Sequence, residues 1–509
     1  MKNFYFLVLL ALAFSFSACT STQKLTSAEP IEFTILQIND VYEIAPIEGG
    51  AAGGLARVAQ VKKDLLKENP NTISVLAGDF LSPSLIATLK LDGEPIAGLQ
   101  MVQALNAMGL DYATFGNHEF DLSSAELLQS RIDQSDFEYV CANAFYTDGE
   151  MVQPFTQSLN GQKREVPPYA VHTFAGKNGK QVKVAIIGVV LPFNKANYVR
   201  YTPVEEAFRK AYEAARKEAD IVLGLTHLNM EDDIALAKAV PGSPLFMGGH
   251  EHVNLNHYVE GTIITKADAN AKTAYVHRIQ YDPISGFHNI RSTLLPINEK
   301  VAEDPVTKAV VDRWQGQVNS ILVDMGYHPD RALMIAQEPL ICTEALIRTQ
   351  PTNYGELTCA AIGKAFPEAD IPLLNSGSMR LDDNLVGTVV EYDVLRTYPF
   401  GGPLVQMEVP GAALNTILNT GLIANQGEGG YFQIANVSGE ANNWLIKGKK
   451  LAPDQTYTLA LPEFVAQGNE ARLEIFADYT YVKKDKLMMD GQEVDNDLRN
   501  VVIAYMGGR

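Results

Sequence analysis

Cysteine is scarce in this sequence, with four cysteines among 509 residues. Cys19 lies near the N-terminus, so Cys141, Cys342 and Cys359 remain for the rest of the chain. Three cysteines are too few for a disulfide framework in an exported protein of this size, although a bridge between Cys342 and Cys359 stays open. Apolar cores must therefore stabilise the chain, whose length predicts two or three domains.

Positive charge is also limited: 41 lysines and arginines stand against 60 aspartates and glutamates, and the net charge is -19. The sequence contains no cluster of basic residues. Because nucleic-acid backbones are bound by grouped Lys and Arg, a nucleic-acid partner is not expected. An anionic small-molecule substrate would have to be met locally, for example by a metal ion.

Motifs that cradle nucleotides are missing too. No Gly-x-Gly-x-x-Gly sequence occurs, which removes the dinucleotide-binding interpretation. The glycines of residues 48–55 are not followed by Gly-x-x-x-x-Gly-Lys, so they predict a flexible loop. Low-complexity tracts and short repeats are absent, and 46% of the residues are apolar, as in a folded globular protein.

The N-terminus reads as a targeting segment: Lys2 precedes the apolar run FYFLVLLALAF and the small residues SFSAC. This pattern resembles a bacterial lipoprotein signal, which implies a signal peptide over residues 1–18, a lipidated Cys19 and a linker over residues 19–30. Phe16 replaces the usual Leu, and a secretory signal cleaved after Ala18 is the alternative. A lipid would tether an exported protein, periplasmic or at the cell surface, to a bacterial membrane without a spanning helix.

Short apolar runs alternate with segments of helical period, which predicts a layered α/β fold. Amphipathic helices are expected over residues 54–69 and 204–219. Five of the apolar runs stop at residue types that bind metals: Asp40, Asp79, the pair Asn117 and His118, His227, and His250. Because loops converge at the carboxyl ends of strands in α/β sheets, these side chains are expected to share one site.

Five motifs stand at these positions: NDVY at residues 39–42, GDF at 78–80, GNHEFD at 116–121, LTHLN at 225–229 and GGHEH at 248–252. Together they hold four of the nine histidines of the chain. The set resembles the dinuclear metallophosphoesterase superfamily, and the combination of GNHE with GHxH is its most specific part.

The resemblance implies two divalent metal ions, which can be Zn, Mn, Co or Fe given carboxylate, amide and imidazole ligands. Asp79 is implied as the bridging ligand. Asp40 and His252 then complete the first metal, and Asn117, His227 and His250 complete the second. Two ions about 4 Å apart stabilise the attacking and the leaving oxygen of a phosphoryl transfer and bring the pKa of a bound water toward about 7.

His118 is the histidine of these motifs that is left without a metal. By the same resemblance it faces the substrate phosphate, where it stabilises charge in the transition state or protonates the leaving group, and Asp121 orients it. Acid–base help of this kind increases a rate by about 10² to 10⁴.

Tyr42 departs from the superfamily, which usually has Asp-x-His in the first motif. Three interpretations are open: a phenolate ligand to a hard ion such as ferric iron, a hydrogen-bonding neighbour of a three-ligand metal, or a mark of a site that loads one metal tightly. The second is favoured, because a phenol with a pKa near 10 must lose its proton to coordinate, whereas Asp40, Asp79 and His252 with waters can hold a metal.

After residue 295 the apolar residues follow a helical period, which predicts a connecting helix. Four sequence motifs follow this helix: IRTQPTNYGEL at residues 347–357, LLNSGSMR at 373–380, YPFGG at 398–402 and GGYFQ at 429–433. They are similar to the C-terminal domain of the 5′-nucleotidase family, which includes the periplasmic UDP-sugar hydrolases. The implied fold is a four-layer α/β/β/α metallophosphoesterase domain over residues 31–297, a connecting helix within 298–332, and a smaller α/β substrate-binding domain over 333–509 that closes over the metals by rotation.

The resemblance also assigns residues that contact substrate. Arg348 matches an arginine that contacts substrate phosphate or carboxylate groups, and Arg380 matches the arginine that ends the family's Asn-x-Gly-x-x-Arg motif. Guanidinium groups suit the geometry of phosphate. Asn375 would lie near a nucleoside, and Tyr431 matches the first of two aromatics that enclose the base. The second aromatic is absent from residues 468–473, where the Arg472 guanidinium could stack on the base instead.

The sequence thus predicts a metal-dependent hydrolase of phosphate esters of extracytoplasmic nucleotides, a 5′-nucleotidase-like phosphomonoesterase that can also act on nucleotide diphosphates such as UDP-sugars. A dinuclear-metal hydrolase of another ester, a cyclic phosphodiester or a thiosulfonate type, is the first alternative. A ligand-binding lipoprotein without turnover is the second, and seven matching site residues argue against it.

Overall fold

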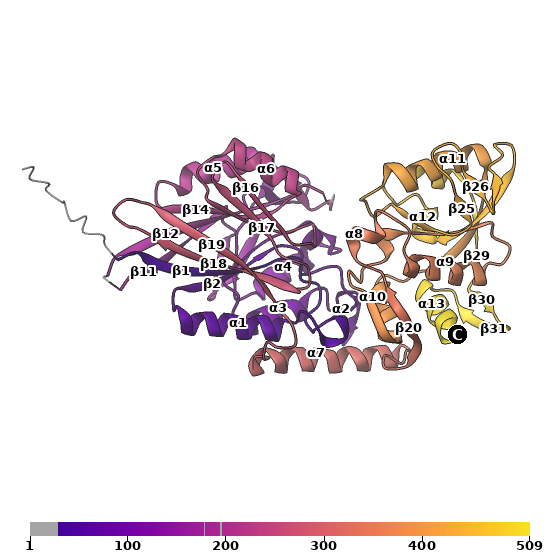
Figure 1. Cartoon of the computed structure of the whole chain (residues 1–509), viewed down its shortest axis with the longest axis horizontal. Helices are drawn as coiled ribbons and strands as arrows, with labels where there is room; N and C mark the ends of the chain where they lie inside the picture. The colour runs from indigo at the N-terminus through magenta and orange to yellow at the C-terminus, as the bar shows by residue number, and fades with distance from the viewer. Residues whose placement is uncertain (1–28, 178, 194–195, 509) are drawn as a thin grey trace, which may run out of the picture.

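The computed structural model describes residues 29–508 except 178 and 194–195. The predicted signal peptide, the lipidation site Cys19 and most of the linker lie outside these residues. Figure 1 shows two lobes side by side, an N-terminal lobe coloured indigo to magenta and a C-terminal lobe coloured orange to yellow. None of the described helices is long and apolar enough to span a membrane.

Two six-stranded sheets form the centre of the N-terminal lobe. The first has the order β19-β18-β1-β2-β5-β6, and the second the order β11-β12-β14-β15-β17-β16. The first sheet consists of β1 (Ile31–Ile38), β2 (Thr72–Ala77), β5 (Tyr112–Thr114), β6 (Glu138–Tyr139), β18 (Thr273–Tyr281) and β19 (His288–Pro296). The second consists of β11 (Tyr169–Ala175), β12 (Gln181–Val190), β14 (Ile221–His227), β15 (Leu245–Gly248), β16 (Leu255–Val259) and β17 (Thr262–Lys266).

The two sheets pack face to face through apolar side chains. Phe33 of β1 stacks on Phe174 of β11 with ring centroids 4.4 Å apart. This core is built from residues of both sheets, including Val75, Leu223 and Leu245. Strands buried on both faces are largely apolar, as β2 and β14 are.

Helices cover the two outer faces and complete four layers. The α1 (Leu55–Glu68) and α3 (Leu99–Met108) helices pack on the first sheet through residues such as Val58 and Leu105. The α5 (Val204–Ala215) and α6 (Met230–Ala239) helices pack on the second through Phe208 and Leu236. Figure 1 shows α1 below the sheets and α5 and α6 above them. The predicted α/β/β/α fold and both amphipathic helices are confirmed.

A long helix, α7 (Pro305–Asp324), lies below the N-terminal lobe in Figure 1 and reaches the boundary between the two lobes. It begins with Asp304 as its N-cap, whose carboxylate accepts the Thr307 N–H at 3.0 Å, followed by proline at the first helical position. Its buried Trp314 donates to Gln103 of α3 at 3.1 Å. The helix is therefore anchored on the N-terminal lobe.

The C-terminal lobe is a smaller α/β unit around a sheet of order β24-β21-β28-β23-β29. Its strands are β21 (Ile371–Asn375), β23 (Leu404–Pro410), β24 (Phe432–Ile434), β28 (Thr456–Pro462) and β29 (Tyr481–Lys483). The main helices are α9 (Asn353–Ala365), α11 (Gly411–Asn419) and α13 (Leu498–Gly507), and β20 (Ala332–Leu340) pairs with β22 (Leu385–Val390) next to α10 (Glu391–Thr397). Cys342 and Cys359 are both buried and free, as is Cys141, so the open Cys342–Cys359 bridge is not formed.

Candidate metal centre

The polar residues at the strand ends lie together at one edge of the sandwich. Asp40 follows β1, Asp79 follows β2, Asn117 follows β5, His227 ends β14 and His250 follows β15. The backbones of four metal-ligand candidates lie in the left-handed region, with φ of 51° at Asp40, 55° at Asp79, 95° at His250 and 59° at His252. Such conformations are costly for residues other than glycine and cluster at functional sites, where the surrounding structure holds them.

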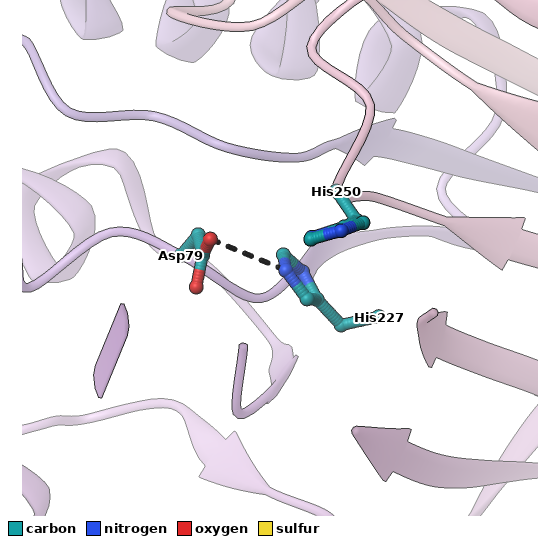
Figure 2. Close-up of side chains that lie close together, drawn as sticks. All are labelled: Asp79, His227 and His250. Carbon is teal, nitrogen blue, oxygen red and sulfur yellow. Dashed lines mark ion pairs between the residues drawn. The ribbon is translucent and has the colours of Figure 1, made fainter. Parts of the chain in front are cut away.

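Two groups of side chains there are close enough to hold a metal ion. Asp40, Asp79 and His252 form the first group, and Asp79, His227 and His250 form the second; within each group the candidate ligand atoms lie within 4.8 Å of one another. Figure 2 shows the second group, with Asp79 and His227 joined by an ion pair of 3.2 Å. Asp79 belongs to both groups, so it has the placement that a bridging ligand requires.

The remaining distances tie the two groups into one centre. His252 Nε2 lies 3.5 Å from Asp40 Oδ1. His227 Nε2 lies 3.2 Å from Asn117 Oδ1, while His227 Nδ1 donates to the Ala77 carbonyl at 2.7 Å. A backbone acceptor at Nδ1 fixes the tautomer and leaves Nε2 free for a metal. The six predicted metal ligands other than Tyr42 therefore lie together.

The chemistry of this donor set fits divalent cations. Asp40 and Asp79 are both almost wholly inaccessible to solvent, and burying two neighbouring carboxylates is costly unless cations compensate their charge. Burial and the nearby His227 lower the pKa of His250 to about 3, so its imidazole is neutral, the form that binds metals. Carboxylate, amide and imidazole ligands suit borderline metals such as Zn, Mn, Co and Fe.

Two glycines make the close approach of these loops possible. A Cβ on Gly116 would lie 2.1 Å from Asp79 Oδ1, and one on Gly249 would lie 2.4 Å from the Ala77 carbonyl oxygen. Any larger residue at either position would push the ligand loops apart. The glycines of the GNHE and GGHEH motifs therefore have a packing role at the centre.

Glu119 of the GNHEFD motif is a structural element of the centre that sequence reasoning did not single out. Its buried carboxylate accepts the backbone N–H groups of Asp79 at 2.9 Å, Phe80 at 2.7 Å, Leu81 at 3.0 Å and Gly116 at 2.5 Å. One carboxylate thus holds the β2 and β5 loops together. Burial, with Asp79 next to it, raises the pKa of Glu119 to about 7.

His118 lies beside the ligands without belonging to either group. Its backbone N–H donates to Asp79 Oδ1 at 2.8 Å, and its Nδ1 lies 2.5 Å from Asp121 Oδ2. The predicted pairing of His118 with Asp121 is present in the geometry. Arg380 of the C-terminal lobe donates to the opposite ring nitrogen, Nε2, at 3.2 Å.

Tyr42 is buried within the first group. Its hydroxyl donates to Asp79 Oδ2 at 3.1 Å and lies 3.0 Å from His252 Nε2. The phenol is therefore in hydrogen-bonding contact with two ligand candidates. Burial, then Asp79 and Asp40, raise the pKa of Tyr42 well above its ordinary value, which favours the protonated phenol in the absence of a metal.

The predicted substrate residues of the C-terminal lobe fall into two sets. Arg348 and Arg380 both approach Glu344, with distances of 3.0 Å and 3.9 Å. Although burial alone would raise it, Arg348 and His252 hold the pKa of Glu344 below its ordinary value. Glu344 carried no motif in the sequence, so only the fold brings it to the site.

The second set surrounds the expected base position. Asn375 donates to Glu470 Oε2 at 2.7 Å. Tyr431 is 5% exposed, so little of its ring is accessible for stacking in this conformation. Arg472 is exposed, and its Nη1 donates to the Ala424 carbonyl at 2.6 Å. Glu470 was not predicted, and it places a carboxylate where the family's second aromatic loop is missing.

Comparison with known protein families agrees with this architecture. The family of calcineurin-like phosphoesterases matches residues 33–254, and the 5′-nucleotidase C-terminal domain matches residues 336–478. The chain thus combines a calcineurin-like phosphoesterase domain with a 5′-nucleotidase C-terminal domain.

Its relatives share about a quarter of its sequence. The 5′-nucleotidase of Vibrio cholerae is 26% identical over 93% of this chain and 92% of its own length. The trifunctional nucleotide phosphoesterase protein YfkN of Bacillus subtilis is 25% identical over 86% of this chain, which spans 32% of that protein.

Solved structures share the fold at lower identity. A 5′-nucleotidase precursor from Thermus thermophilus has a TM-score of 0.75 at 20% identity and covers 94% of this chain and 96% of its own. The sulfate thiohydrolase SoxB of the same organism has a TM-score of 0.67 at 16% identity and covers 93% of this chain and 94% of its own. At these identities the likeness shows the fold alone.

Proposed function

We propose that this protein is a metal-dependent hydrolase of phosphate esters of extracytoplasmic nucleotides, a 5′-nucleotidase-like phosphomonoesterase, with nucleotide diphosphates such as UDP-sugars as a second substrate class. The observation that carries the proposal is the position of Asp79. It belongs to two potential metal-binding groups and also accepts the backbone N–H of His118. A shared carboxylate beside an acid–base histidine is the arrangement that phosphoryl transfer at two metals needs.

Two divalent ions are proposed at this centre. Asp40, Asp79 and His252 would hold the first, and Asp79, Asn117, His227 and His250 would hold the second. When bound, such ions supply positive charge to the phosphoryl oxygens and a water of lowered pKa. Tyr42 is proposed to remain a phenol that hydrogen-bonds to Asp79 and His252 rather than a ligand.

The chain's own residues then bind the phosphate and move a proton. Arg380 and Arg348 offer guanidinium donors to phosphate oxygens, and such charge-assisted hydrogen bonds are stronger than neutral ones. His118 presents Nε2 toward the Arg380 guanidinium, while the Asp121 carboxylate at Nδ1 holds the imidazole ring in place. His118 is therefore placed to donate a proton to the leaving oxygen.

The nucleoside part of the substrate is proposed to lie against Asn375, Tyr431 and Arg472. Tyr431 would have to become more accessible for its ring to stack on a base. Because the second aromatic is missing, base binding is expected to lack one stacking contact, which contributes about 0.5 to 1.5 kcal/mol beyond area burial.

Export and anchoring are proposed from the N-terminal sequence. Lipidation of Cys19 would hold the enzyme at a bacterial membrane, periplasmic or at the cell surface, with residues 19–30 as a linker. Labelling of the full-length chain with a radioactive fatty acid, and its loss in Cys19→Ala, would test this part separately from the activity.

The decisive experiment measures phosphate release by protein lacking residues 1–19, loaded with Mn, Zn, Co or Fe. The panel contains mononucleotides, UDP-sugars, cyclic nucleotides and an aryl phosphate. Release from mononucleotides in a metal-dependent manner is expected. Release from cyclic nucleotides or the aryl phosphate alone would favour another ester as the natural substrate, and inactivity with every metal would contradict the proposal.

A further inference from the structure

His252 is held from two sides by two different domains. Its Nε2 faces the first metal group, 3.5 Å from Asp40 Oδ1 and 3.0 Å from the Tyr42 hydroxyl. Its Nδ1 faces the C-terminal lobe, 3.0 Å from Asp382 Oδ2. His252 and Asp382 are 130 positions apart in the sequence, and both are buried.

Asp382 is itself fixed in place. Its Oδ1 accepts the backbone N–H of Glu344, the first residue of α8 (Glu344–Ile347), at 2.8 Å. Its backbone carbonyl accepts Lys272 Nζ of the N-terminal lobe at 3.2 Å. Glu344 Oε2 adds a second carboxylate oxygen 3.6 Å from His252 Nδ1. Asp382 is therefore held at Oδ1 and at its backbone carbonyl, which leaves Oδ2 directed at His252.

His227 and His252, one from each metal group, differ in the acceptor at their Nδ1 atoms. His227 donates its Nδ1–H to the Ala77 carbonyl, an acceptor of its own domain. His252 instead has a charged acceptor, and that acceptor comes from the other domain. The first group also has only one imidazole, because Tyr42 stands where the superfamily usually has a histidine. The orientation of His252 therefore matters more for its metal than the orientation of either histidine in the second group.

We propose that Asp382 is a positioning residue for the first metal: by accepting the Nδ1–H of His252 it directs Nε2 toward Asp40 and Asp79, so the C-terminal domain sets the affinity of a metal held by the N-terminal domain. The inference rests on the proposed function, which places a metal at Asp40, Asp79 and His252. An acceptor at Nδ1 fixes the tautomer of a ligand histidine and raises its basicity, and loss of such a partner typically weakens metal binding about 10- to 100-fold.

Asp383 offers a matched control. It neighbours Asp382, is also buried and also crosses the domain boundary, where its Oδ2 accepts the Glu48 N–H at 3.1 Å. Its carboxylate bonds to the Glu48 backbone rather than to His252. Asp383→Asn therefore removes the same charge from the same interface without removing the acceptor of the ligand histidine.

The test uses metal-free protein covering residues 20–509, titrated with Co²⁺ while heat and visible absorption are recorded. Cobalt absorption reports the coordination geometry as well as the affinity. In Asp382→Ala we expect the first site to bind about 10- to 100-fold more weakly and its absorption to change, while the second site keeps its affinity. Asp382→Asn is expected to lie between Asp382→Ala and the unmodified protein, and Asp383→Asn to match the unmodified protein.

Three results would overturn the inference: unchanged binding of both metals in Asp382→Ala, equal weakening of both metals, or the same selective loss in Asp383→Asn. Thermal unfolding of the metal-free variants checks that they fold, and if Asp382→Ala does not fold, the isosteric Asp382→Asn decides. Unmodified protein that binds no metal would overturn the proposed function as well, whereas unmodified protein that binds two metals beside an unchanged Asp382→Ala would overturn this inference alone.

Discussion

Arg380 Nη2 lies 3.2 Å from His118 Nε2, although the two residues are 262 positions apart and belong to different lobes. The guanidinium and the imidazole therefore converge on one point beside Asp79. A phosphate bound there would replace the direct contact and accept hydrogen bonds from both groups.

Arg380→Ala should therefore weaken substrate binding. A hydrogen bond to a charged group contributes about 1.5 to 3 kcal/mol, so KM for a mononucleotide is expected to rise roughly 10- to 100-fold. Arg380→Lys keeps the charge but loses the fork geometry, so its KM should lie between those of Arg380→Ala and the unmodified protein. Steady-state kinetics with inorganic phosphate as a competing product would measure both effects, and an unchanged KM in Arg380→Ala would remove this arginine from the phosphate site.

His118→Ala should retain both metals, because the His118 side chain belongs to neither ligand group. It should lose most turnover, because the proposed proton donor is removed. The expected decrease in kcat is about 10² to 10⁴ for an aliphatic leaving group. For an aryl phosphate, whose leaving group needs little protonation, the decrease in kcat should be smaller. Metal content by atomic emission and kcat on both substrates are the measurements; full activity on the mononucleotide would exclude His118 from the mechanism.

Asp79→Asn should lose metal as well as activity, since its carboxylate is shared by the two groups. An amide offers one neutral oxygen in place of two charged ones, so neither ion is expected to bind tightly. Metal content after dialysis against a weak chelator tests this expectation. Unchanged content of two metals per chain would contradict the bridging assignment.

Tyr42→Phe removes the hydroxyl that contacts Asp79 and His252 but keeps the ring in its buried position. If the phenol is a hydrogen-bonding neighbour, the loss is about 0.5 to 1.5 kcal/mol, roughly a tenfold effect on first-metal affinity or less. Tyr42→His should then tighten the first metal or leave activity similar. Collapse of activity together with loss of visible absorbance in Tyr42→Phe would instead indicate a phenolate bound to ferric iron.

Local patterns in the sequence were enough for the reaction class and for the metal-ligand candidates. The apolar runs that stop at Asp40, Asp79 and His227 are strands, and helices α1 and α5 lie in the segments with helical period. Within each sheet these ends meet because parallel strands place their carboxyl ends at one edge. The packing of the two sheets on each other then brings His227 of the second sheet to within 3.2 Å of Asp79 of the first. The pairing of His118 with Asp121 is equally local, since only three positions separate them.

Contacts between the two lobes could not be predicted in the same way. Glu344 and Asp382 stand in no motif, and their approach to His252 depends on how the C-terminal lobe docks. The burial of Tyr431 and the contact of Glu470 with Asn375 also depend on packing around them. The sequence by itself determined the fold class, the motifs and the kind of chemistry, because these follow from short-range periodicity and residue type. Only the tertiary structure decided which side chains hold the ligands in place, because those contacts join segments more than a hundred residues apart across a domain boundary.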